Sequence, residues 1–110
     1  MNTEPMTTIV EFQVDTEKNS VEEWLVEWSK RAEDSRVEEP QTPSYAAAVN
    51  VESNDNVLVF ERYSRGDESL KAHLDRAAHK ELQARMGEQQ MTKRRVMSTR
   101  FVDVDDYGWW

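Results

Sequence analysis

Cysteine is absent from this sequence, and its 110 residues include only three glycines and three prolines. Without cysteine, the chain has no disulfide framework, no thiolate zinc site and no thiol nucleophile. No apolar run approaches the length that is needed to cross a bilayer. The N-terminal residues also lack the basic-then-apolar pattern of a secretory signal, so we expect a cytoplasmic protein.

Positive charge is also scarce. Fourteen Lys and Arg residues against 22 Asp and Glu residues give a formal net charge of -8. A surface with this excess of negative charge repels nucleic acids and anionic membranes, so we expect neither as a partner. The one compact basic run, residues 93–95, is expected to pair with acidic residues at the start of the last strand.

Apolar residues are few for a chain of this length. They make up 37% of the sequence, and the mean hydropathy is -0.88. We therefore expect one domain with a thin core, which a partner surface would help to complete. This domain is predicted at residues 7–104, between a disordered leader at 1–6 and an aromatic tail at 105–110. We expect the tail to dock on the protomer or to reach across a dimer.

Hydrophobic periodicity predicts four strands and two helices. In chain order, the prediction is a strand at 7–14, a helix from 21 to 39 at most, strands at 44–51 and 57–63, a helix at 67–86 and a strand at 94–104. This β-α-β-β-α-β order predicts an α+β, ferredoxin-like fold, with both helices on one face of a four-stranded antiparallel sheet. The other face also carries apolar side chains, and a homodimer through that face would cover them.

The first predicted helix has clear signals at both ends. Ser20 and Glu23 have the spacing of a capping box, and Pro40 disfavours a helical residue before it. Trp24 and Trp28 lie on the predicted inward stripe, whereas Arg31 is expected on the remaining surface.

Two stretches resemble the antibiotic biosynthesis monooxygenase (ABM) domain family. One runs from the third predicted strand into the second predicted helix, and the other lies between the first helix and the second strand. In the second stretch, Pro40-Gln41 stands where the family usually has a glycine. The resemblance covers roughly residues 8–103, and it implies a dimeric α/β barrel with a small pocket between each sheet and its own helices. The residues that carry it are Glu61-Arg62-Tyr63, Asp67, Ser69-Leu70, Ala72-His73-Leu74 and His79, with Arg36, Glu38, Glu39, Pro40 and Ser44-Tyr45 upstream.

The resemblance also implies an activity, and it points to cofactor-free oxygenation of a small aromatic phenol, quinol or anthrone-like polyketide. Such chemistry needs a base, a dry pocket and donors for a developing oxyanion. His73 is the candidate base or proton shuttle, although it could instead be a half-buried histidine bonded to Glu61 or to a backbone carbonyl. His79, six residues further on, would project roughly 120° away on a continuous helix.

Other candidate site residues have a structural interpretation beside the functional one. Glu61, a second catalytic candidate, could orient His73, but an ion pair with Arg62 or Arg100 is favoured. Four aromatic residues and one methionine are candidate substrate-binding residues, and each could equally belong to the sheet surface or the core. They are Trp24, Trp28, Tyr45, Tyr63 and Met86.

No metal or cofactor is expected. The chain has no HExxH motif and no EF-hand loop. Haem is disfavoured because Arg62-Tyr63 stands where the haem-degrading relatives carry a tryptophan. Two alternatives to the oxygenase remain open: an isomerase, decarboxylase or cyclase that uses the same pocket, and a non-catalytic ligand-binding dimer.

Overall fold

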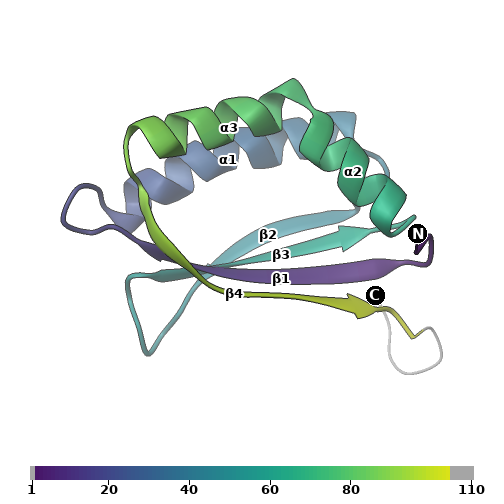
Figure 1. Cartoon of the computed structure of the whole chain (residues 1–110), viewed down its shortest axis with the longest axis horizontal. Coiled ribbons are helices and arrows are strands. Elements are labelled where there is room, and N and C mark those ends of the chain that lie inside the picture. The colour runs from purple at the N-terminus through teal and green to yellow at the C-terminus, as the bar shows by residue number, and fades with distance from the viewer. Residues whose placement is uncertain (1, 105–110) are drawn as a thin grey trace.

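Four antiparallel strands form one sheet in the order β2-β3-β1-β4, and all helices lie over one of its faces (Figure 1). The computed structural model describes residues 2–104. The predicted ferredoxin-like α+β fold is confirmed. The elements are β1 (Met6–Val14), α1 (Val21–Glu38), β2 (Ser44–Val49), β3 (Asn56–Tyr63), α2 (Asp67–Asp75), α3 (Ala77–Glu88) and β4 (Thr92–Val102).

The start and end of α1 are those that the sequence predicts. The Ser20 side chain accepts a hydrogen bond from the Glu23 backbone N–H, and the Glu23 carboxylate accepts one from the Ser20 N–H. This reciprocal capping satisfies two N–H groups that have no partner within the helix. The helix ends at Glu38, two residues before Pro40.

The second predicted helix is broken into α2 and α3 by one extended residue. Arg76 has φ -67° and ψ 143°, and neither proline nor glycine stands at the break. The Arg76 guanidinium donates two hydrogen bonds, of 2.9 and 2.8 Å, to the carboxylate of Asp34 on α1. This bidentate contact ties the break to the neighbouring helix, and a periodicity pattern does not reveal it.

The inward stripe of α1 contains a charged residue that we expected on the surface. Trp24, Trp28, Arg31 and Ser35 are all buried, and Arg31 is only 1% exposed. Their spacing places them on one face of the helix. The two tryptophans belong to the hydrophobic core, whose buried members are Val14, Trp24, Trp28, Val57, Val59, Leu82 and Met91.

Residues 2–6, in the stretch predicted as a leader, contact the rest of the domain in the structure, and β1 begins one residue earlier than predicted. Met6 is the first residue of β1 and is 3% exposed. Asn2 exchanges two hydrogen bonds with Asp67, one from its own N–H to the carboxylate and one from the Asp67 N–H to its carbonyl. Gly66 lies beside this contact with φ +54°, a conformation that side chains disfavour. The predicted aromatic tail at 105–110, like Met1, lies outside the described residues.

The sheet face that the helices do not cover is apolar. Ile9, Leu58 and Phe60 lie on it, half-buried, with Met97 and Phe101, which are 38% and 52% exposed. On β4, both faces of the strand are largely exposed. No helix within residues 2–104 is long and apolar enough to span a membrane.

Candidate functional site

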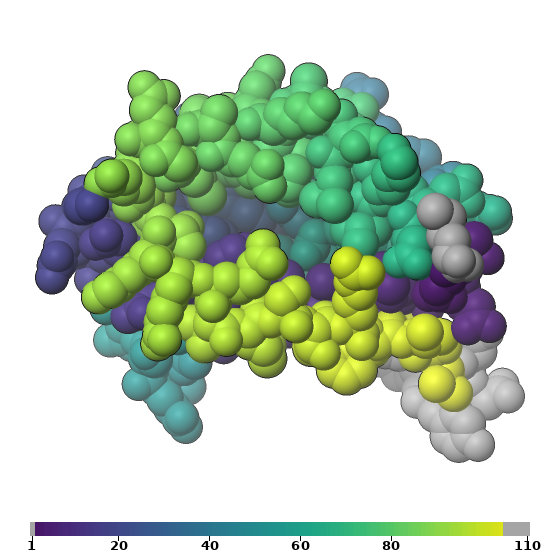
Figure 2. Space-filling view, viewed as in Figure 1, coloured from purple at the N-terminus to yellow at the C-terminus, as the bar shows by residue number. Residues whose placement is uncertain are grey.

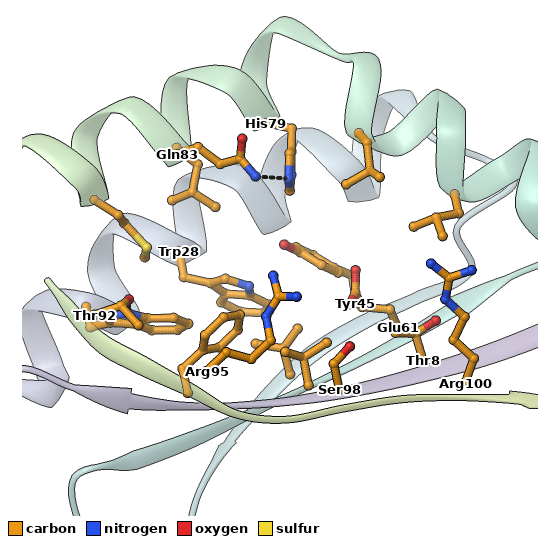
Figure 3. A pocket seen from close by; sticks show the side chains of 18 residues that line it. Thr8, Trp28, Tyr45, Glu61, His79, Gln83, Thr92, Arg95, Ser98 and Arg100 are labelled. Carbon is orange, nitrogen blue, oxygen red and sulfur yellow. Dashed lines mark hydrogen bonds between the residues drawn. The ribbon is translucent and has the colours of Figure 1, made fainter.

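A cavity of about 380 Å³ lies between the sheet and the helices. Figure 2 shows the hollow between β4 and the helical layer, so the cavity opens along the exposed β4 strand. Its wall is mainly apolar and aromatic, with a few polar groups, and most of these are labelled in Figure 3. Such a wall suits a small, flat organic ligand. The main apolar wall residues are Val10, Phe12, Trp24, Trp28, Val59, Leu70, Leu82 and Met86.

The two tryptophans serve as both core and cavity wall. Trp24 is fixed by a 2.9 Å hydrogen bond from its indole N–H to the Thr92 hydroxyl. The Trp28 ring lies 4.9 Å from the Tyr45 ring. Met86 also lines the cavity, as the sequence suggested. The core and pocket interpretations of these side chains are therefore compatible.

Tyr45 contributes a hydroxyl group to the cavity. Its ring lies 4.9 Å from the His73 ring, and its hydroxyl end points into the open space (Figure 3). Burial, together with the charge of Glu61, raises the pKa of the phenol above its ordinary value. The hydroxyl therefore stays protonated at neutral pH and can donate a hydrogen bond to a ligand oxygen.

Glu61 is the carboxyl group of the cavity wall. Burial raises its pKa above the ordinary value, although a 2.5 Å hydrogen bond from the Tyr63 hydroxyl acts in the opposite direction. Tyr63 is 1% exposed and supports Glu61 from behind rather than lining the cavity. The favoured ion pair of Glu61 is not what the structure shows, since Arg62 pairs with Asp103 and Arg100 lies 3.5 Å from Asp67.

His73 is completely buried and lies behind the cavity wall rather than on it. Its Nδ1 lies 2.7 Å from a carboxylate oxygen of Glu39. Burial opposes ionisation of Glu39, but hydrogen bonds from Arg31 and His73 hold the pKa of this carboxyl below its ordinary value. The Arg31 guanidinium, which can only donate, lies 2.8 Å from the same Nδ1, so the two neighbours of this nitrogen favour opposite tautomers. Nε2 lies on the side of Glu61, whose Oε1 is 3.6 Å away.

The buried imidazole is neutral at physiological pH. Burial and the nearby Arg31 charge lower the pKa of His73 to about 4, although Glu39 favours the charged form. Nε2 has no hydrogen-bond partner among the described residues. Because the pKa of Glu61 is raised and that of His73 is lowered, a proton bound by Glu61 stays on the carboxyl group rather than moving to Nε2.

Arg31 is the site residue that sequence reasoning missed. Its guanidinium donates to Glu39 at 2.5 Å, to Asp34 at 3.1 Å and to the His73 backbone carbonyl at 2.9 Å. These contacts fix the Glu39 carboxylate and hold α2 against α1. The available signal was the spacing from Trp28, which places Arg31 on the buried stripe.

His79 lies nearer to His73 than a continuous helix would allow. The break at Arg76 turns α3, so the two imidazole rings lie 5.1 Å apart and His79 lines the cavity (Figure 3). The expected 120° separation is therefore wrong. One ring nitrogen lies 3.2 Å from the Gln83 amide nitrogen, while Nδ1 is buried and has no partner in the described part of the chain. Burial lowers the pKa of His79.

Metal binding has no evident ligand set here. Within residues 2–104, no group of three or more His, Cys, Asp and Glu side chains is placed to hold a metal ion.

The structure is a ferredoxin-like domain with a cavity between sheet and helices, in which one carboxyl group is backed by a buried imidazole. The family model for antibiotic biosynthesis monooxygenases matches residues 5–85. The chain therefore belongs to this family, as its resemblance in sequence implied.

Solved structures share the fold at low sequence identity. A candidate antibiotic biosynthesis monooxygenase from Caulobacter crescentus CB15 superposes with a TM-score of 0.82 and 18% identity, over 94% of this chain and 92% of the other. A candidate from Nitrosomonas europaea superposes with a TM-score of 0.79 and 18% identity, over 98% of each chain. A candidate from Chloroflexus aurantiacus J-10-fl superposes with a TM-score of 0.74 and 16% identity, over 94% of this chain and 97% of the other. A comparison with curated proteins gave no significant match.

Proposed function

We propose that this protein is a cofactor-independent monooxygenase that acts on a small, electron-rich aromatic compound, such as a phenol, a quinol or an anthrone-like polyketide. The observation that carries the proposal is Glu61, a carboxyl group with a raised pKa on the wall of a cavity whose other lining residues are mainly apolar and aromatic. A base of this kind is poised to deprotonate a weakly acidic substrate near neutral pH. Family membership supports an oxygenase in particular.

The reaction needs no external reductant, because the substrate supplies the electrons. Deprotonation makes the ring carbon electron-rich enough to reduce O2. One oxygen atom becomes bonded to carbon, as a carbonyl group in an anthrone-like substrate or as a hydroxyl group in a quinol, and the other leaves as water with two hydrogen atoms from the substrate. For a quinol, the balanced outcome is a hydroxylated quinone and one molecule of water. An apolar cavity favours this outcome because it limits side reactions of the intermediate with bulk water.

We assign the role of base to Glu61 rather than to His73, because Glu61 lines the cavity and His73 does not. Glu61 would take the substrate proton and hold it, with the neutral imidazole of His73 behind it and Nε2 at 3.6 Å. Glu39 and Arg31 would keep the imidazole in place through their contacts with Nδ1. Tyr45 would donate a hydrogen bond to the developing oxyanion, and Trp28 would hold the flat ring.

A homodimer in the cytoplasm remains part of this proposal. The uncovered sheet face is flat and apolar, and a second copy related by a two-fold axis offers a matching apolar surface. Phe60→Glu should then shift the sedimentation coefficient from dimer to monomer, whereas Val26→Glu, an exposed change on α1, should not. A wild-type protein that sediments as a monomer at micromolar concentration would contradict the dimer.

Oxygen uptake by metal-stripped protein tests the function. A panel of quinols, naphthalenediols and anthrones would be supplied to wild type, Glu61→Gln and the matched control Glu81→Gln, an exposed change on α3. We expect uptake by wild type and the control, loss of at least about 100-fold in Glu61→Gln, and one 18O atom from 18O2 in the product. Equal uptake by all three proteins would retire the role of Glu61. Product formation without oxygen would instead favour an isomerase, decarboxylase or cyclase. Binding without turnover would favour a non-catalytic ligand-binding dimer.

A further inference from the structure

Arg95 is a guanidinium group on the cavity wall that forms no hydrogen bond or ion pair with any residue from 2 to 104. Its charge acts on Glu61 at longer range and lowers the pKa of that carboxyl against the effect of burial. The guanidinium carbon lies 6.0 Å from the centre of the Phe12 ring. The other arginines of the described part form ion pairs, except Arg94, which donates to the Gln13 side chain at 2.9 Å. The predicted pairing of the basic run 93–95 with acidic residues is therefore not what the structure shows.

Arg95 is placed to contact a ligand in the cavity rather than to stabilise the fold. Its side chain rises from β4 into the cavity, towards Trp28 and Tyr45 (Figure 3). The strand itself is exposed, so the charged group stands at the mouth and keeps contact with water. Apolar ring surfaces therefore lie inside the cavity, and a fixed positive charge lies at its opening.

The positive charge of Arg95 is opposite in sign to the net charge of the chain. The chain has a net charge of -8, which lowers the local concentration of any anion near its surface. A single unpaired arginine at the mouth offsets this repulsion locally. Its planar guanidinium presents two parallel N–H donors, which match the two oxygens of a carboxylate.

We propose that Arg95 binds a carboxylate group carried by the ligand, so that the preferred ligand is an aromatic acid with its ring inside the cavity and its carboxylate at the mouth. This inference rests on the proposed function, since it names the substrate class of the same site. Trp24 and Trp28 contact the aromatic ring of the ligand, and Arg95 favours ligands that carry a carboxylate. Arg100, the other cavity arginine of β4, already lies 3.5 Å from Asp67 and is the weaker candidate.

Calorimetric titration with two probes of the same shape tests the proposal. The probes are 2-naphthoate, which is ionised at pH 7, and 2-naphthamide, which is neutral. We expect wild type to bind the acid about tenfold more tightly than the amide, as charge-assisted hydrogen bonds typically give. In Arg95→Gln this preference should disappear, while the affinity for the amide stays the same, which shows that the cavity is intact.

Arg94→Gln is the matched control, because it removes the same charge from the neighbouring residue. Arg94 pairs in register with Gln13, on the sheet face opposite to the cavity. This variant should keep the preference for 2-naphthoate. Equal loss in both variants would overturn the proposal in favour of a long-range charge effect, and so would a preference that survives in Arg95→Gln. Failure of both probes to bind to wild type would also overturn it.

The result is separable from the oxygenase proposal. Uptake of oxygen with neutral quinols depends on Glu61 and is measured on the wild-type protein, independently of the two probes. If uptake occurs but the acid has no advantage, only the carboxylate inference fails. If 2-naphthoate binds more tightly than 2-naphthamide but no substrate on the panel consumes oxygen, the oxygenase proposal fails. The inference that the ligand is an aromatic acid is then still supported.

Discussion

Replacement of Arg31 with methionine would remove a buried cation and leave the Glu39 carboxylate without its main partner. Arg31 is 1% exposed, and its guanidinium bonds to Glu39, Asp34 and the His73 carbonyl. In the variant, Glu39 would keep hydrogen bonds only from His73 and, at 3.3 Å, from Thr42. Loss of one partner from a buried ion pair typically costs about 3–5 kcal/mol. That loss is a large part of the roughly 5–15 kcal/mol that stabilises a single domain.

Urea unfolding at pH 7 measures this loss, and Arg36→Met is the matched control. Arg36 pairs with Glu33 on the same helix, but both side chains are largely exposed, at 71% and 63%. The control should therefore leave the free energy of unfolding almost unchanged. In the double variant Arg31→Met with Glu39→Met, neither charge is buried, so part of the loss should be recovered. A loss below about 1 kcal/mol in Arg31→Met alone would refute the role that we assign to this buried arginine.

Three further predictions concern pH, backbone strain and the cavity carboxyl. Because folding lowers the pKa of His73 from 6.5 to about 4, the unfolded chain binds more protons than the folded chain between these pH values. The free energy of unfolding should therefore fall as pH drops through this window. In urea titrations, His73→Gln should show a weaker dependence of this free energy on pH. Gly66→Ala should cost about 1–3 kcal/mol, because a Cβ at φ +54° would lie 2.6 Å from a backbone oxygen, whereas Gly87→Ala meets nothing within 4 Å and should leave the melting temperature unchanged or raised. Tyr63→Phe removes a hydrogen bond that lowers the pKa of Glu61, so infrared titration should show this carboxyl ionising at higher pH, and an unchanged midpoint would contradict the contact.

Local patterns predicted the elements of this fold well, because each strand and helix carries its own periodicity and end signals. The Ser20 capping box and Pro40 mark the two ends of α1, and both lie next to the helix in sequence. The alternating residues of β1 and β3 predict two strands, and the structure places them side by side in register. Such signals depend on neighbours in sequence, which a single chain displays directly.

The candidate site depended on contacts between distant residues, and here the sequence was less informative. The sequence named Glu61 and His73, but it could not show that Glu39 from the end of α1 completes their chain of contacts. Nor could it show that Arg76, by binding Asp34, would break the helix and bring His79 to the cavity. Each of these partners lies more than 30 positions away, where periodicity carries no information.

The exposed strand at the mouth has a consequence for how such a protein can change over time. The groups that we propose to handle the proton lie on α2, on β3 and at the C-cap of α1, whereas Arg95 and its neighbours at the opening belong to β4. Substitutions on β4 meet few packing constraints, because the strand buries little of its surface. New substrates could therefore be acquired by mutation of one strand, while the catalytic apparatus is inherited without alteration.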